Sequence, residues 1–293
     1  RANSIKLIDL MTIADLLNAG KDYLRGRETA VLDSEVVLGF VLGVDKEYLF
    51  AHGGDEVEDA LLHLFYKYLD RVKNGEPVSY ITNSKEFFGL DFFVDKRVLV
   101  PRPETEMLVE EALRFLKSNA EEGKRFRVLD VGTGSGNIAI ALAKNFDCQE
   151  VVALDVSEGA IEVAKINIEQ YSLEDKVQVY QSDLLDAIDD GENFDVIVAN
   201  LPYIGRIKNN NVDENVEKHE PDSALFAGDD GLKLYKKMFQ HIVDKNIGFG
   251  LLLGEFGFGQ RDDLEVLLNK YFDHGWCIKS DLAGIDRMFV VEG

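Results

Sequence analysis

The fold of this chain is decided by a glycine-rich stretch, Asp130-Val131-Gly132-Thr133-Gly134-Ser135-Gly136. The apolar run at 127–131 predicts a buried strand, and the pattern at 137–144 predicts a helix. In a glycine-rich turn from strand to helix the backbone can touch a ligand, because side chains are missing and the helix N-terminus offers N–H groups. The alternative is a tight turn without a ligand. We therefore expect an α/β fold with a ligand site at this turn.

Strands and helices alternate outward from this stretch. Further strands are expected at 151–154, 177–180, 194–199, 249–253, 276–279 and 287–291, and helices from Pro103 onward and at 158–171, 232–244 and 260–271. Such alternation predicts a mostly parallel seven-stranded sheet with helices on both faces. The final two strands lie too close together for a helical crossover, so we expect the last strand to run antiparallel.

The first part of the chain has a different pattern. Thr12 and Asp45 are expected to cap short helices, and Gly75 to end a longer helix from about 56 to 74. Two short apolar runs around a glycine between 87 and 94 predict a hairpin. We expect a helical bundle domain for substrate recognition at 1–80, a β-hairpin linker at 81–102 and the main domain at 103–293.

Composition narrows the classes of function and partner. The formal net charge of -22, without a Lys/Arg block, disfavours a nucleic-acid partner and suits a basic protein or a small ligand, although solubility alone explains it equally well. The longest apolar runs fall far short of a membrane span of about 20 residues, and the start has no signal-peptide pattern. Cys148 and Cys277 form no ligand pair, and the histidines at 52, 63, 219, 241 and 274 lack metal-ligand spacing. We expect a cytoplasmic monomer without a metal.

The spacing of the glycines distinguishes between cofactors. A dinucleotide fingerprint requires G-x-G-x-x-G, but its third glycine would fall on Asn137, and the spacing here is G-x-G-x-G. This favours S-adenosylmethionine over NAD. The predicted cofactor residues of the loop are Gly132, Thr133, Gly134, Ser135 and Gly136.

Two neighbouring strand ends supply more cofactor residues. Asp155 ends the next strand, where an acid in such folds accepts from ribose hydroxyls. The alternative role is a helix N-cap, for which Ser157 is the better candidate. After the third strand, Asp183 can accept from the adenine amino group and Leu184 can cover the ring. The alternative is a turn Asp with a core Leu.

The motif Asn200-Leu201-Pro202-Tyr203 follows the apolar run at 194–199, at the edge where ligands of open α/β sheets bind. A planar amide or amine nitrogen is a poor nucleophile, so orientation must supply much of the rate. The side-chain carbonyl of Asn200 and the backbone carbonyl of Leu201 can accept its two N–H groups. Tyr203 can stack on the acceptor, and Pro202 keeps Leu201 extended. The motif predicts methylation of a planar NH2 group, with Asn200, Pro202 and Tyr203 as catalytic residues; the alternative is an ordinary turn.

Taken together, these motifs resemble the HemK/PrmC family of peptide chain release factor glutamine methyltransferases, over nearly the whole chain. The resemblance is carried by the loop at 130–136, Asp155, the motif at 200–203, Pro101-Arg102-Pro103-Glu104-Thr105-Glu106, Glu220-Pro221 with Ala224-Leu225, the stretch 228–232, and Asp286-Arg287. It implies a Rossmann-like S-adenosylmethionine-dependent methyltransferase fold. It also implies methylation at N5 of the glutamine in the Gly-Gly-Gln motif of release factors, gripped by the N-terminal bundle.

The resemblance also implies roles for single residues. Gly132, Gly134, Gly136, Asp155, Leu184 and Asn200 would contact the cofactor, and Asn200, Leu201, Pro202 and Tyr203 would hold the substrate glutamine. The family usually has Pro where this chain has Leu201, whose backbone carbonyl is unaffected but whose φ is freer.

Three other functions stay open at this point. An adenine-N6 methyltransferase could use the same Asn-x-Pro-Tyr motif on a flipped base, although the negative charge disfavours it. A ribosomal-protein glutamine is a second possible substrate. A regulatory module that binds the cofactor without catalysis is the third, and the intact Asn200, Pro202 and Tyr203 speak against it.

Overall fold

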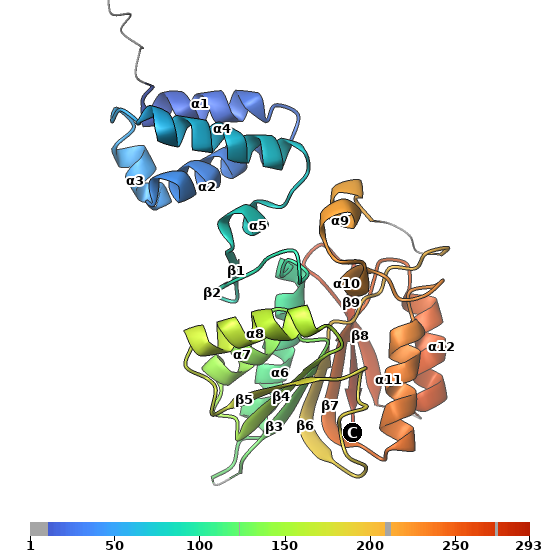
Figure 1. Ribbon diagram of the computed structural model, residues 1–293. Coiled ribbons are helices and arrows are strands. Elements are labelled where there is room, and N and C mark those ends of the chain that lie inside the picture. The colour runs from blue at the N-terminus through green and yellow to red at the C-terminus, as the bar shows by residue number, and fades with distance from the viewer. Residues whose placement is uncertain (1–10, 123, 209–211, 273–274) are drawn as a thin grey trace, which may run out of the picture. The chain divides into compact units, whose positions relative to one another are not determined.

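The computed structural model describes residues 11–122, 124–208, 212–272 and 275–293. The chain forms two compact units, Arg1–Asn83 and Ser84–Gly293, whose elements are labelled in Figure 1. Residues 1–10 of the expected N-terminal bundle lie outside the described part. No helix in the described part is long and apolar enough to span a membrane.

In the described residues of the first unit, the regular elements are helices. Its helices are α1 (Ile13–Tyr23), α2 (Ala30–Leu42), α3 (Lys46–Ala51), α4 (Asp59–Lys73) and the short α5 (Val78–Thr82), which the sequence did not predict. Thr12 and Asp15 form a capping box at α1, since Thr12 Oγ1 accepts from Asp15 N at 3.2 Å and Asp15 Oδ2 accepts from Thr12 N at 3.0 Å. Asp45 accepts from Tyr48 N at 2.7 Å and caps α3. Both predicted N-caps are confirmed.

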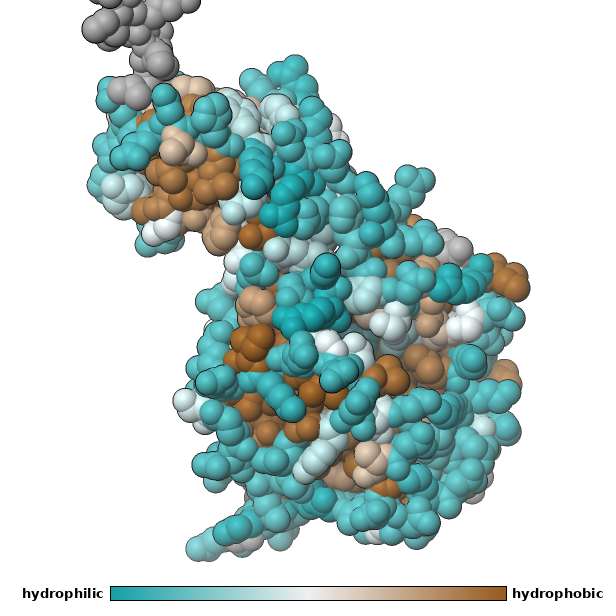
Figure 2. Space-filling view, in the orientation of Figure 1, coloured by the Kyte–Doolittle hydropathy of each residue, from teal (hydrophilic) through white to brown (hydrophobic). Residues whose placement is uncertain are grey.

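The core of the first unit leaves part of α2 uncovered. Leu16, Leu38, Phe65 and Leu69 are fully buried at its centre. Helix α2 is apolar on more than one side, so it also exposes Val31, Leu32, Val36 and Phe40. Figure 2 shows apolar side chains gathered on the surface over α2 and α3. The unit therefore presents an exposed apolar surface on α2.

The second unit begins with the predicted hairpin. Strands β1 (Lys85–Phe87) and β2 (Leu90–Phe92) pair antiparallel across the two-residue turn Phe88-Gly89. Both turn residues have positive φ, 53° and 71°, as a tight hairpin turn that follows the strand twist requires. Phe87 and Phe92 point into the core and are buried.

The remainder of the second unit contains one seven-stranded sheet. Its strands are β3 (Arg127–Val131), β4 (Glu150–Asp155), β5 (Val177–Gln181), β6 (Asn193–Ala199), β7 (Gly248–Glu255), β8 (Trp276–Ser280) and β9 (Asp286–Glu292). They lie in the order β5-β4-β3-β6-β7-β9-β8. All neighbouring pairs are parallel except those of β9, which is antiparallel to both β7 and β8. The predicted mostly parallel sheet with an antiparallel last strand is confirmed.

Helices cover both faces of this sheet (Figure 1). On one face lie α6 (Glu106–Ser118), preceded by the 3-10 turn η1 (Pro103–Thr105), α7 (Asn137–Asn145) and α8 (Glu158–Gln170); on the other lie α11 (Lys233–Asp244) and α12 (Arg261–Tyr271). The expected long loop after β6 is more structured than the sequence indicated, because it contains α9 (Glu214–His219) and α10 (Asp222–Leu225).

The strand order reverses beside β3. The chain proceeds from β3 through β4 to β5 at the edge, then returns so that β6 pairs with the other side of β3. At such a point the connections from the two neighbouring strands run to opposite faces of the sheet. A crevice therefore opens at the carboxyl ends of the strands, where ligands of α/β sheets bind. The glycine-rich loop follows β3, and the Asn200 motif follows β6, so both lie at this crevice.

Candidate active site

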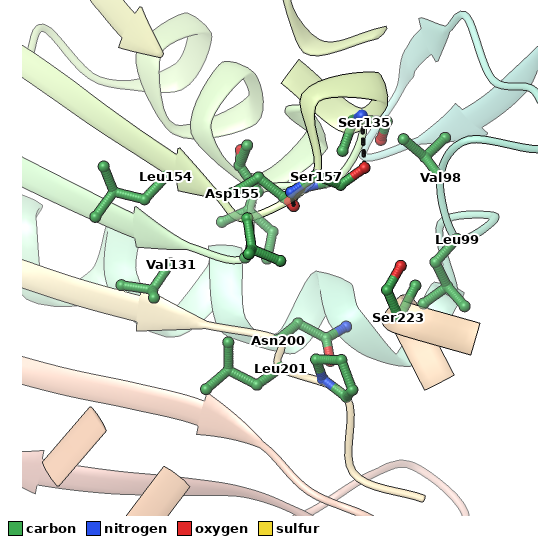
Figure 3. Close-up of a pocket in the computed structure, with 18 of the residues that line it drawn as sticks. Val98, Leu99, Val131, Ser135, Leu154, Asp155, Ser157, Asn200, Leu201 and Ser223 are labelled. Carbon is green, nitrogen blue, oxygen red and sulfur yellow. Dashed lines mark hydrogen bonds between the residues drawn. The ribbon is translucent and has the colours of Figure 1, made fainter. Parts of the chain in front are cut away.

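A cavity opens at the carboxyl ends of β3, β4, β5 and β6. From these strand ends its lining includes Gly132, Thr133, Gly134 and Ser135, then Asp155, then Asp183 and Leu184, then Asn200, Leu201 and Pro202. Leu99 and Ser223 line the opposite side (Figure 3). The structure therefore brings together ten predicted site residues from four separate strand ends. Gly136 and Tyr203 are not among the residues that line this cavity.

The glycine-rich loop turns through three residues with positive φ, Gly132 at 77°, Gly134 at 54° and Gly136 at 79°. A Cβ on Gly134 would meet no atom within 4 Å, so the space above its backbone is open. A Cβ on Gly136 would instead lie 3.3 Å from Ile140 and 3.4 Å from Ala164 of α8. Gly134 thus suits close approach of a ligand, whereas Gly136 lets two helices pack; a cofactor contact for Gly136 stays a prediction.

Asp155 ends β4 with its carboxylate at the cavity. Its Oδ2 accepts from Gly134 N and its Oδ1 from Ser157 N, each at 2.9 Å. Burial raises the pKa of Asp155, and these backbone N–H groups counteract the rise. Ser157 caps α8, because its Oγ accepts from Ala160 N at 3.2 Å. The carboxylate is therefore not needed as a cap, and Asp155 lines the cavity (Figure 3), where its remaining lone pairs can accept from a ligand.

The turn after β5 places Asp183 and Leu184 differently. Leu184 is buried within the core cluster and has a φ of 55°, a strained value for a non-glycine residue. Ser182 Oγ stabilises this turn by donating to Leu184 O at 2.8 Å and accepting from Ala187 N at 3.0 Å. Asp183 is exposed, and Lys237 Nζ donates to its Oδ2 at 2.5 Å. Leu184 therefore offers an apolar wall, while Asp183 already has one partner.

Asn200 lies between two cavities. It lines the first cavity, and together with Leu201 and Pro202 it also lines a second one. Tyr203 lines only the second cavity, where Arg102, Phe258 and Arg287 are further lining residues. A ligand in the first cavity and one in the second would therefore meet at the motif that follows β6.

Buried polar groups hold this motif from behind. Asn200 Nδ2 donates to Thr105 Oγ1 at 2.9 Å, and Thr105 Oγ1 donates to Glu255 Oε2 at 2.6 Å. Tyr203 Oη donates to Glu255 Oε1 at 3.1 Å. Burial raises the pKa of Tyr203 and, as the largest effect, also that of Glu255. The tyrosine stays a neutral hydroxyl donor over the physiological pH range.

Two of these residues have no assigned role in the sequence analysis. Thr105 lies in the Pro101–Glu106 stretch that carries part of the family resemblance, but nothing local shows its function. Glu255 follows an apolar run at 249–253 after one glycine, and an acid at the carboxyl end of a buried strand is the signal that could have identified it. Among the described residues, no group of three or more His, Cys, Asp or Glu side chains is arranged to hold a metal ion. His274 lies outside that part.

Comparison with known proteins places the chain in a family. The PrmC N-terminal domain model matches residues 15–82, and the ribosomal protein L11 methyltransferase (PrmA) model matches residues 105–207. The N-terminal domain of human METTL16 in complex with SAH has a TM-score of 0.51 at 18% identity, over 69% of this chain and 75% of that one, and shows the fold alone.

Curated relatives align over almost the full chain. The release factor glutamine methyltransferase of Koribacter versatilis is 36% identical over 282 residues, which is 96% of this chain and 98% of the relative. That of Bacillus subtilis is 36% identical over 284 residues, 95% of this chain and 96% of the relative. With both parts of the chain included at this identity, the protein belongs to the release factor glutamine methyltransferase family.

Proposed function

We propose that this protein transfers a methyl group from S-adenosylmethionine to the side-chain amide nitrogen, N5, of the glutamine in the Gly-Gly-Gln motif of peptide chain release factors. Membership of the release factor glutamine methyltransferase family supports the reaction and the substrate class. The Gly-Gly-Gln motif is the finer part of the proposal and rests on the resemblance of the sequence motifs.

The observation that carries the proposal is the position of Asn200 between the two cavities. Methyl transfer needs the donor and acceptor in contact, with the lone pair of the acceptor nitrogen aimed at the methyl carbon. Asn200 Oδ1 and the backbone carbonyl of Leu201 are the two acceptors that would hold the N–H groups of the glutamine amide. Pro202 keeps Leu201 extended and so fixes the direction of that carbonyl. Tyr203 supplies an aromatic face in the second cavity.

The first cavity fits S-adenosylmethionine by the chemistry of its lining. Asp155 offers a carboxylate for ribose hydroxyls, and the open backbone at Gly134 accepts close approach. Leu154, Val156 and Leu184 give apolar surface suited to an adenine ring. When bound, the cofactor supplies a methyl group on a positively charged sulfur, which makes that methyl electrophilic.

The remaining loop residues complete the proposed cofactor site. Gly132, Thr133 and Ser135 line the same cavity and present the start of α7, whose N-terminal N–H groups favour a carboxylate. Asp183, beside Leu184, would accept from the adenine amino group while Lys237 occupies one of its oxygens. These roles, and any contact from Gly136, belong to the proposal.

The N-terminal unit fits a protein partner. Val31, Leu32, Val36 and Phe40 form the exposed apolar surface of α2, and such surfaces mark protein–protein contacts. We assign this surface to the release factor. The proposal sets the reaction in the cytoplasm, where translation terminates, and has the protein act as a monomer without a direct nucleic-acid partner.

Mass spectrometry of a purified release factor tests the proposal. The factor is incubated with this protein and S-adenosylmethionine, and the peptide that contains Gly-Gly-Gln is sequenced. We expect one added methyl group on that glutamine, and none in a release factor with Ala in place of the glutamine. Methylation at another residue, or none although calorimetry shows cofactor binding, would contradict the proposed substrate.

A further inference from the structure

Glu255 is a buried acid at the end of β7, only 3% exposed. Its two oxygens accept from two hydroxyls, Oε2 from Thr105 Oγ1 at 2.6 Å and Oε1 from Tyr203 Oη at 3.1 Å. A buried charge without donors is costly, so the acid depends on both hydroxyls. Tyr203 belongs to the motif of the proposed glutamine site, and Thr105 contacts Asn200 of that motif. Glu255 is thus linked to both ends of the glutamine site.

Thr105 determines the orientation of the Asn200 side-chain amide. A threonine hydroxyl has one hydrogen to donate and two lone pairs that accept. Because its hydrogen goes to the Glu255 carboxylate, Thr105 can only accept from Asn200, whose Nδ2 lies 2.9 Å away. The NH2 end of the Asn200 amide is therefore held at Thr105, and its oxygen is directed elsewhere.

We propose that Thr105 and Glu255 are positioning residues of the methyl transfer, which fix the Asn200 amide so that its oxygen, and not its NH2, meets the substrate amide. This inference rests on the proposed function. In the reversed orientation, Asn200 would present a donor to the donor NH2 of the glutamine and lose the bond that orients it. Through its other oxygen, Glu255 holds the Tyr203 ring against the second cavity.

The base of this network is rigid. Tyr235 is fully buried on α11, and its hydroxyl donates to the backbone carbonyl of Glu255 and lies 3.1 Å from that of Ala199. It therefore bridges the carboxyl ends of β6 and β7. Thr105 stands at the end of η1, 1% exposed, directly before α6. The orientation of Asn200 is set by well-packed elements and not by the loop alone.

The orientation of the Asn200 amide also depends on the protonation state of Glu255. The groups that face the Glu255 carboxyl are Tyr203, Arg287, Glu104 and, on α11, Tyr235. Burial raises the pKa of Glu255, while Thr105, Tyr203 and Arg287 lower it. Once protonated at low pH, Glu255 can donate to Thr105, whose own hydrogen then turns to Asn200 and reverses its amide. Turnover should therefore fall as the pH drops through the pKa of Glu255, and that fall should be absent in Glu255→Gln.

The test uses variants of the full-length protein with a release factor as substrate. Thr105→Val keeps the side-chain shape and removes the hydroxyl, Thr105→Ser restores the hydroxyl, and Ser118→Ala removes an exposed hydroxyl at the far end of α6 as the matched control. We expect kcat to fall roughly 10- to 100-fold in Thr105→Val and in Glu255→Gln. We expect Thr105→Ser and Ser118→Ala to stay close to wild type. Cofactor affinity by calorimetry should change little in all four, whereas the melting temperature should fall in Thr105→Val, because the buried Glu255 carboxylate loses a donor.

The double variant Thr105→Val with Glu255→Gln should lose no more kcat than the more severely impaired of the two single variants, because both substitutions act on the same hydrogen bond. A normal kcat in folded Thr105→Val would overturn the inference, as would a loss of kcat in Thr105→Ser equal to that in Thr105→Val. In either case the proposed function stands as long as the wild-type protein methylates the release factor. If wild type does not methylate the release factor, the proposed function fails instead.

Nuclear magnetic resonance tests the positioning role of Thr105 independently of any turnover measurement. The side-chain NH2 signals of Asn200, identified by their loss in Asn200→Asp, should shift in Thr105→Val and return in Thr105→Ser. Signals that are the same in Thr105→Val and wild type would overturn the inference.

Discussion

Asn200 is the side chain on which the proposed chemistry depends most. It lies between the two cavities, and its amide nitrogen is already committed to Thr105. We expect Asn200→Ala to lower kcat by at least about 100-fold, because the substrate nitrogen loses its orienting acceptor. Cofactor affinity, measured by calorimetry, should change only a few-fold. Asn119→Ala at the exposed C-cap of α6 serves as control; unchanged turnover in Asn200→Ala would refute the role of its carbonyl.

Leu201 differs from the proline usual in the family, and the sequence predicts that Leu201→Pro is tolerated. The structure adds a cost in stability. The Leu201 side chain is 2% exposed in the core cluster, and its N–H donates to the Tyr235 hydroxyl. Proline keeps the backbone carbonyl but loses that donor and part of the packing, so we expect the unfolding free energy to drop by about 2 kcal/mol. Urea unfolding and kcat measure the two effects; a stable but inactive variant would mean that the leucine side chain itself serves the reaction.

Asp130 makes stability depend on pH. It is fully buried beneath the glycine-rich loop, and burial raises its pKa from 3.8 to about 7. An acid with a higher pKa in the folded state binds more protons when folded. Its contribution to stability is therefore full below pH 3.8 and is lost as the pH rises through about 7.

We expect the unfolding free energy of wild type to fall between about pH 5 and 8 by roughly 1–3 kcal/mol more than that of Asp130→Asn. Urea unfolding at each pH measures the difference. The same pH slope in both proteins would show that Asp130 does not titrate in this range.

At the scale of elements, one side chain connects the loops that frame the glutamine site. Gln260 is completely buried at the start of α12. Its Nε2 donates to the backbone carbonyls of Tyr203 at 2.7 Å and Asp230 at 3.0 Å, and its Oε1 accepts from Gly257 N at 2.7 Å. Gly231 has a φ of 85°, and a Cβ there would overlap the Tyr203 carbonyl. The loops after β6, before α11 and after β7 therefore depend on one another.

Gln260→Ala should remove the hydrogen bonds that this side chain makes to Gly257 N and to the backbone carbonyls of Tyr203 and Asp230. Since the loss of its partner costs a buried backbone group about 1–3 kcal/mol, we expect the unfolding free energy to fall by at least about 2 kcal/mol. The Tyr203 carbonyl should also lose its fixed position, which raises KM for the release factor. Gln240→Ala, whose amide donates to Asp244 on the exposed side of α11, is the matched control. Equal stability of the two variants would contradict this role for Gln260.

At the scale of the whole molecule, the charge is strongly unbalanced. The formal net charge of -22 comes from 54 acidic against 32 basic residues. Repulsion among like charges destabilises the compact state, and salt screens it, because the Debye length shrinks from about 30 Å at 0.01 M to about 8 Å at 0.15 M. We expect the melting temperature to rise by a few degrees, roughly 2–4 °C, when NaCl is raised over that range. KCl should act equally; a constant or falling melting temperature would mean that local ion pairs outweigh the net charge.

Local patterns in the sequence determined the elements and the identity of much of the site. The caps at Thr12 and Asp45, the turn at Phe88-Gly89 and the strand-to-helix loop at 130–136 depend on neighbours in the chain, so they could be predicted without the fold. Polar residues directly after apolar runs likewise form a local pattern, and they predicted the edge of the sheet where the ligands bind. The short helices α5, α9 and α10 carry too few residues for periodicity to identify them.

Long-range pairing was decided only by the tertiary structure. That β9 lies inside β8 follows from burial, since β9 buries Met288–Val291 while β8 stays half-exposed at the edge. Thr105 meets Glu255 across 150 positions of sequence and Asn200 across 95. The sequence by itself determined which residues could do the chemistry. Which of them meet is set by the order of the strands, because that order depends on side-chain packing summed over the whole sheet and not on any one segment.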